Sequence, residues 1–131
     1  MNSEKNPNDI LAAEELFEDA ENAIENRDAP LAEKLLRQVV TKNPNFSYAY
    51  RLLTEIVASN GRYPEAIRIL DQCIRNDAGY SYAYYLSAKY RYRSNDAETA
   101  SRFLARARSL EPASRLYALA EALLREHVRR C

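Results

Sequence analysis

The sequence contains blocks that recur every 34 residues. The letters SYAY at residues 47–50 return at residues 81–84, and the same interval separates Ala32, Ala66 and Ala100, and also Leu36, Leu70 and Leu104. A fixed period between about 20 and 50 residues marks an array of similar supersecondary units, each of which packs on its neighbours. The period therefore predicts a repeat architecture before any single motif is considered.

The composition favours helices as the repeated elements. Hydrophobic residues make up 47% of the 131 residues, which is enough for a core, and there are only two glycines. Few glycines argue for long helices joined by short breaks and against a turn-rich β protein. There is no run of about eighteen apolar residues, which a membrane span would need, and the polar N-terminus lacks the apolar core of a secretory signal. We therefore expect a cytoplasmic protein without a membrane span.

Apolar periodicity and the positions of Asn, Asp, Pro and Gly predict seven helices. Five are expected at about residues 10–26, 48–59, 64–76, 82–94 and 114–129, and two more follow caps at Asp28 and Asp96 and end near residues 42 and 110. Asn8 or Asp9 is the expected cap of the first helix. Residues 1–9 are expected to form a flexible tail, and residues 10–131 a single domain.

Three copies of the repeat align when they start at Ala13, Ser47 and Ser81. The aligned sets are alanine at 32, 66 and 100, leucine at 36, 70 and 104, a large residue at Leu16, Tyr50 and Tyr84, and proline at 44 and 112. This pattern resembles the tetratricopeptide repeat (TPR), a helix–turn–helix unit. The departures are Ala78 in place of proline, and Asp19, Ser87 and Arg91 at positions that are usually apolar.

The resemblance implies an all-α fold. We expect a right-handed superhelical solenoid of three hairpins, at about residues 13–46, 47–80 and 81–113, with a C-terminal capping helix at about residues 114–129. Alanine at the crossings would allow the helices to approach closely. Polar residues on the outer faces of the first and last helices lead us to expect a complete array. Tyr50, Tyr84, Tyr90 and Cys73 fall on packing faces and are expected in the core.

In the TPR family the first helix of each hairpin lines a concave groove, so the resemblance also implies the groove residues. They are Glu14, Phe17, Glu21 and Ile24 in the first repeat, Tyr48, Arg51, Glu55 and Ala58 in the second, Tyr82, Tyr85, Lys89, Tyr92 and Arg93 in the third, and Leu116, Leu119, Leu123 and His127 in the capping helix. We expect five of them to be apolar anchors: Tyr82, Tyr85, Tyr92, Leu119 and Leu123. Arg51, Lys89 and Arg93 would set polarity and register.

These groove residues predict a protein-binding function. Tyrosine offers a large, rigid contact area with a hydroxyl that can stay hydrated, and an exposed apolar strip usually marks a binding site. The expected ligand is a helical or extended segment of a partner protein, and the role is that of a scaffold, adaptor or chaperone. Two alternatives remain open: a tyrosine-rich surface without function, and a groove filled by the chain's own tail or by a second copy.

One subtype of the family does not fit. Some TPR domains grip a C-terminal carboxylate through lysine, asparagine and arginine in the groove. At those positions only Arg51 and Lys89 could serve here. We therefore do not expect the partner to be an acidic C-terminal tail held by such a set of residues.

Charge is segregated along the chain and raises two alternative functions. The balance is −7 over residues 1–35 and +7 over residues 36–131. In an array, sequence order is spatial order, so opposite ends could stack molecules into a weak homo-oligomer or a self-assembling structural protein. The Arg- and Tyr-rich C-terminal half could also bind single-stranded nucleic acid. The zero net charge and the acidic first repeat argue against nucleic acid.

Nothing in the sequence predicts catalysis, a metal or a cofactor. The single histidine, His127, has no serine, cysteine or second histidine placed to form a nucleophile–base pair. The two cysteines, Cys73 and Cys131, do not make a metal cluster or a disulfide framework, and Cys131 is expected to be mobile. We therefore expect a non-enzymatic protein with no catalytic residues, no metal and no cofactor.

Overall fold

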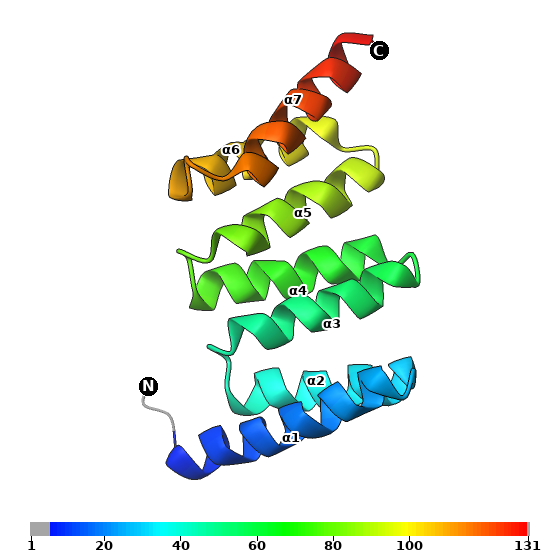
Figure 1. The fold of residues 1–131 in the computed structure, drawn as a ribbon, viewed down its shortest axis with the longest axis vertical. Coiled ribbons are helices and arrows are strands. Elements are labelled where there is room, and N and C mark those ends of the chain that lie inside the picture. The colour runs from blue at the N-terminus through cyan, green and yellow to red at the C-terminus, as the bar shows by residue number, and fades with distance from the viewer. Residues whose placement is uncertain (1–5, 131) are drawn as a thin grey trace.

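The computed structural model describes residues 6–130, and these form seven helices and no strands. The helices are α1 (Pro7–Glu25), α2 (Ala29–Lys42), α3 (Ser47–Ser59), α4 (Tyr63–Asn76), α5 (Ser81–Arg93), α6 (Ala97–Leu110) and α7 (Arg115–Arg130). Figure 1 shows them stacked in chain order from α1 at the bottom to α7 at the top. Each helix packs on the one before it and the one after it, so the all-α repeat architecture is confirmed.

The first helix begins earlier than the sequence predicted. The Asn6 side chain accepts a hydrogen bond from the Asn8 N–H at 2.9 Å, and Pro7 takes the first helical position. Proline suits that position because its missing N–H would have no helical partner there. Starting the helix at Ile10, with Asn8 or Asp9 as its cap, was therefore wrong. Residues 1–5 of the predicted tail, and the predicted mobility of Cys131, lie outside the described residues.

The predicted caps of the second helices are confirmed. Asp28 accepts from the Leu31 N–H at 3.2 Å, and Asp96 accepts from the Thr99 N–H at 3.1 Å. Each carboxylate satisfies one of the backbone donors that a helix start leaves without a partner. The last helix is capped by Ser114, whose hydroxyl accepts from the backbone N–H three residues on, at 3.2 Å.

The repeated alanines and leucines form the core. Ala32, Ala66 and Ala100 are fully buried, and the three periodic leucines are no more than 3% exposed. The tyrosines expected in the core, Tyr50, Tyr84 and Tyr90, are also buried, as is Cys73. Burial raises the pKa of the Cys73 thiol to about 12, which makes it an unreactive core residue at neutral pH.

Two of the departures from the repeat pattern form one polar contact between hairpins. Ser87 is fully buried and accepts a hydrogen bond from Arg91 at 3.1 Å. The Arg91 guanidinium also lies 3.6 Å from the Asp71 carboxylate on α4 and 4.4 Å from the ring centre of Phe103 on α6. Buried polar groups need partners, and here each one has them. Asp19, the third of these departures, is exposed on α1.

A second polar cluster ties the first two hairpins together. Glu33 on α2 forms ion pairs with Arg37 at 2.9 Å and with Arg62 at 2.6 Å, and Arg62 reaches Glu65 at 2.9 Å. Arg37 also pairs with Glu65 across the interface between α2 and α4. Four charges that share partners in this way fix the relative position of the hairpins better than an isolated surface pair would.

Candidate functional site

A continuous row of aromatic rings crosses the first helices of the hairpins. The Phe17 ring on α1 lies 5.8 Å from the Tyr48 ring on α3, and a second contact, of 4.7 Å, joins it to Phe46. The Arg51 guanidinium joins Tyr48 to Tyr82 in this row, because it lies 5.7 Å from the ring centre of Tyr48 and 4.4 Å from that of Tyr82. Cation–π contacts of this length hold an arginine over the rings.

The row continues along α5 and reaches α7. Tyr82 and Tyr85 have ring centres 5.4 Å apart, and Tyr85 stacks on Tyr117 at 5.5 Å. Near the end of α5, Tyr92 meets the edge of His127 at 5.1 Å. Five groove residues predicted from sequence (Phe17, Tyr48, Arg51, Tyr82 and Tyr85) therefore lie in one connected row. Glu55 lies beside it, 3.4 Å from Arg51.

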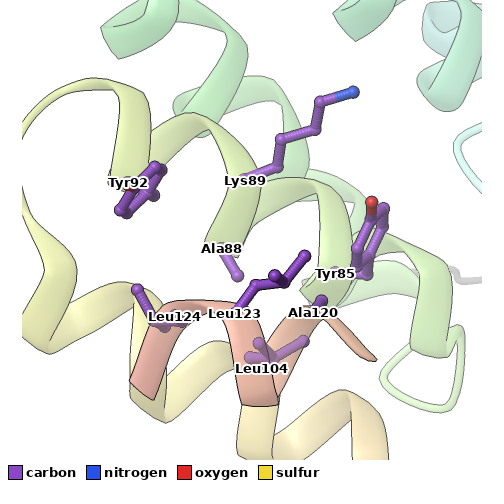
Figure 2. Close-up of a pocket in the computed structure, with 8 residues that line it drawn as sticks. All are labelled: Tyr85, Ala88, Lys89, Tyr92, Leu104, Ala120, Leu123 and Leu124. Atoms are coloured by element: carbon purple, nitrogen blue, oxygen red, sulfur yellow. The ribbon is translucent and has the colours of Figure 1, made fainter. Parts of the chain in front are cut away.

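A pocket of about 330 Å³ opens at the C-terminal end of this row. Its lining residues come from three helices and are Tyr85, Ala88, Lys89 and Tyr92 of α5, Leu104 of α6, and Ala120, Leu123 and Leu124 of α7. Figure 2 shows the leucines gathered at the base of the pocket, with Tyr92 and Tyr85 on opposite sides. An apolar pocket with a few polar groups at its rim is the usual form of a binding site.

The predicted leucines of α7 divide into two groups. Leu123 is 62% exposed and lines the pocket. Leu116 and Leu119 are also exposed, at 45% and 59%, but neither lines the pocket. Arg93 is exposed on α5 and likewise does not line the pocket. These three residues remain predicted members of a wider groove surface.

Tyr117 and Leu124 were not among the residues predicted for the site, although the repeat register points to them. Tyr117 follows the buried Ala83 by 34 residues, and Leu124 follows the buried Tyr90 by the same interval. Tyr117 is 4% exposed, and its hydroxyl lies 2.9 Å from the Ser81 hydroxyl. The Tyr117 contact fixes α7 on α5 and so places the α7 wall of the pocket.

The hydroxyls of Tyr82 and Tyr117 keep their protons at neutral pH. Burial raises the pKa of Tyr82 above its ordinary value, and Arg51 offsets part of that effect. Burial also raises the pKa of Tyr117, against the effect of its hydrogen bond with Ser81. Burial disfavours the charged phenolate, so both hydroxyls keep their protons.

The described residues show no arrangement of acidic, histidine or cysteine side chains that could hold a metal ion. Within residues 6–130, no helix is both long and apolar enough to cross a membrane. The site therefore consists of an aromatic row, a short set of charges and an apolar pocket.

Helices that pair into hairpins and stack in chain order define a helical repeat protein. The sequence profile of the tetratricopeptide repeat matches residues 23–90 and, in a second placement, residues 57–124. Together these matches cover most of the chain, and the chain belongs to the tetratricopeptide repeat family. The comparison with curated protein sequences gave no match.

Solved TPR domains share the fold over almost the whole chain. The TPR domain of Arabidopsis OM64 is 18% identical with a TM-score of 0.79, and the match covers 91% of this chain and 98% of that one. The first TPR domain of Spaghetti (RPAP3), bound to the HSP90 peptide SRMEEVD, is 12% identical with a TM-score of 0.81, covering 98% and 99%. The TPR2B domain of yeast Sti1, in a complex with pHsp70, is 20% identical with a TM-score of 0.80, covering 89% and 98%.

Proposed function

We propose that this protein binds a segment of a partner protein along the aromatic row, as a scaffold, adaptor or chaperone without enzymatic activity. The observation that carries the proposal is that the row of rings ends in an open apolar pocket. Leu123 is 62% exposed there, and Tyr92 is 38% exposed beside it. Large side chains left this accessible lose their contact with water when a ligand covers them, which favours binding.

Two of the structural neighbours support a peptide as the ligand. The Spaghetti domain is bound to an HSP90 peptide, and the Sti1 domain is in a complex with pHsp70. The present chain has Phe17, Tyr85 and Glu55 at groove positions where a carboxylate-gripping TPR domain needs lysine, asparagine or arginine. We therefore propose a partner held mainly by apolar anchors and not by a terminal carboxylate.

The contacts of the basic residues weaken the nucleic-acid alternative. Six arginines of the C-terminal half form salt bridges within the described residues: Arg91, Arg102, Arg108, Arg125, Arg129 and Arg130. A seventh, Arg106, lies over the Tyr84 ring at 5.9 Å. Arginines already paired with carboxylates attract a phosphate backbone less strongly than unpaired ones, so these arginines favour nucleic acid less than their number suggests.

Capture of partners from the source cell by wild-type protein and by Tyr92→Ala/Leu123→Glu tests this proposal. Both side chains are exposed, so the double variant should fold like the wild type, which circular dichroism would check. The matched control is Leu11→Glu, which changes a leucine that is 58% exposed on α1, away from the pocket. We expect one partner to be captured by the wild type and by the control and lost from the pocket variant. Equal capture by all three proteins would show that the pocket is not the binding site.

A further inference from the structure

The α1 end of the groove is acidic. This helix contains seven acidic residues and no basic residue: Asp9, Glu14, Glu15, Glu18, Asp19, Glu21 and Glu25. Salt bridges within residues 6–130 involve none of them. Glu14 and Glu21 are at the groove-lining positions and are exposed. A ligand that reaches α1 therefore meets an uncompensated negative field.

The middle of the groove is electrically balanced. Arg51 pairs with Glu55 at 3.4 Å, and its guanidinium is also held over the Tyr48 and Tyr82 rings. A paired arginine that is held in place by two rings has little net charge to offer a ligand. This stretch therefore favours uncharged side chains in the ligand.

The α5 end is basic, with two exposed cations. Lys89 and Arg93 are exposed on α5, and neither forms a salt bridge in the part of the chain that the structure describes. Lys89 lines the apolar pocket with its aliphatic stem. Figure 2 shows its ammonium group pointing away from the leucines at the base, so a side chain can fill the pocket without displacing the charge.

The geometry points to a partner segment of defined charge order, an inference that rests on the proposed function. We propose that an aliphatic or aromatic side chain with acidic residues beside it occupies the pocket between α5 and α7. Basic residues at the other end of the same segment then lie over α1. The reverse order would bring acidic residues against Glu14 and Glu21 and basic residues against Lys89 and Arg93.

The length of the groove makes the two ends act separately. From α1 to α5 there are two steps between the first helices of neighbouring hairpins, on the order of 20 Å in total at usual helix spacings. That distance exceeds the screening length of about 8 Å at physiological salt. Each end therefore recognises its own part of the ligand. An extended segment of about six residues, or a helix of about thirteen, would span the distance.

Two synthetic peptides of identical composition test the charge order. The first has a leucine flanked by two glutamates at one end, a neutral spacer, and two lysines at the far end. The second exchanges the glutamates and the lysines, so that the lysines flank the leucine. With fluorescein-labelled peptides and anisotropy at low salt, we expect the first to bind about tenfold more tightly, with a difference that shrinks as salt rises.

Charge reversal in the protein locates the cationic end. In Lys89→Glu/Arg93→Glu the preference for the first peptide should disappear or invert. The matched control is Arg68→Glu/Arg75→Glu, which makes the same change in net charge at two exposed positions on α4, outside the predicted groove. This control should keep the preference of the wild type, and circular dichroism should show both variants folded.

Several results would overturn the inference. It is wrong if the two peptides bind the wild type equally, if the second binds more tightly, or if neither binds at about 1 mM. It is also wrong if the preference survives Lys89→Glu/Arg93→Glu. A dimer that Leu123→Glu converts to monomer would show that a second copy occupies the pocket. The capture experiment with Tyr92→Ala/Leu123→Glu tests the proposed function separately. Loss of a partner from that variant does not depend on the order of charges in the partner's segment.

Discussion

Replacing Arg27 with glycine should stabilise the protein. Two residues after the end of the first helix of each hairpin stands a residue with positive φ, and these residues are 34 positions apart: Arg27 at 58°, Gly61 at 78° and Asn95 at 66°. At each end the next backbone N–H donates to the carbonyl five residues back, at 2.8, 3.3 and 2.9 Å. The backbone conformation is therefore repeated, while the residue that must adopt it is not.

The expected size follows from the cost of that conformation. The left-handed region costs an ordinary side chain about 1–2 kcal/mol, whereas glycine adopts it without strain. Glycine also loses more conformational freedom on folding, which offsets about 0.5–1 kcal/mol of the gain. Arg27→Gly should therefore raise the free energy of unfolding by about 0.5–1 kcal/mol. Gly61→Ala should lower it by a similar amount, although a Cβ there would meet no atom within 4 Å.

Urea denaturation followed by circular dichroism would measure these free energies. Arg27→Ala is the control, because alanine removes the side chain but keeps the strain of a Cβ at positive φ. Asn95→Gly should change stability least, since asparagine tolerates this conformation better than arginine does. The reasoning would be refuted if Arg27→Ala stabilised the protein as much as Arg27→Gly, or if Gly61→Ala had no effect.

Four other changes test the core and the polar contacts. Ala66→Leu should cost about 1–3 kcal/mol in urea denaturation, because Ala66 is fully buried where helices cross; wild-type stability would show that the crossing is loosely packed. Tyr84→Phe should cost about 1 kcal/mol because it removes a 3.0 Å hydrogen bond to a backbone carbonyl. Tyr50→Phe should be neutral or stabilising, because the buried Tyr50 hydroxyl has no hydrogen-bond partner within the described residues. The hydrogen bond from Arg62 lowers the pKa of Glu33 below its ordinary value, so Glu33 stabilises the fold at neutral pH and loses this effect as the pH falls through its folded-state pKa. Thermal unfolding at several pH values should show this loss in the wild type and not in Glu33→Gln.

The repeat period made the fold predictable, because the same residue types occupy the same packing positions in three successive hairpins. Alanine at the crossings and leucine beside it can be recognised without any structure, and the burial of Ala66 and Leu70 follows directly. The start of the first helix was less predictable. Asn6, Asn8 and Asp9 are all good caps, and only Pro7 at the first helical position decides between them.

The pocket was less predictable than the aromatic row because it depends on how α7 is rotated. Hydrophobic spacing on α7 is satisfied by two overlapping faces, one with Leu119 and Leu123 and one with Tyr117 and Leu124. The choice between them rests on contacts that a hydrophobic pattern does not contain. Tyr117 stacks on Tyr85 at 5.5 Å and places its hydroxyl 2.9 Å from that of Ser81.

Ser81 makes a hydrogen bond that recurs with the repeat period, and it also makes a contact with α7 that does not recur. Ser47 donates to Asp77 at 2.7 Å, and Ser81 makes the equivalent hydrogen bond to Glu111, 34 residues later in both partners. Of these two serines, Ser81 also contacts a tyrosine hydroxyl, because α7 carries Tyr117 where α3 and α5 carry the buried Ala49 and Ala83. A larger residue at this one position of the register brings α7 against α5 through a polar contact. Leu123 and Leu124 of the same helix then line the pocket together with Tyr85 and Tyr92 of α5.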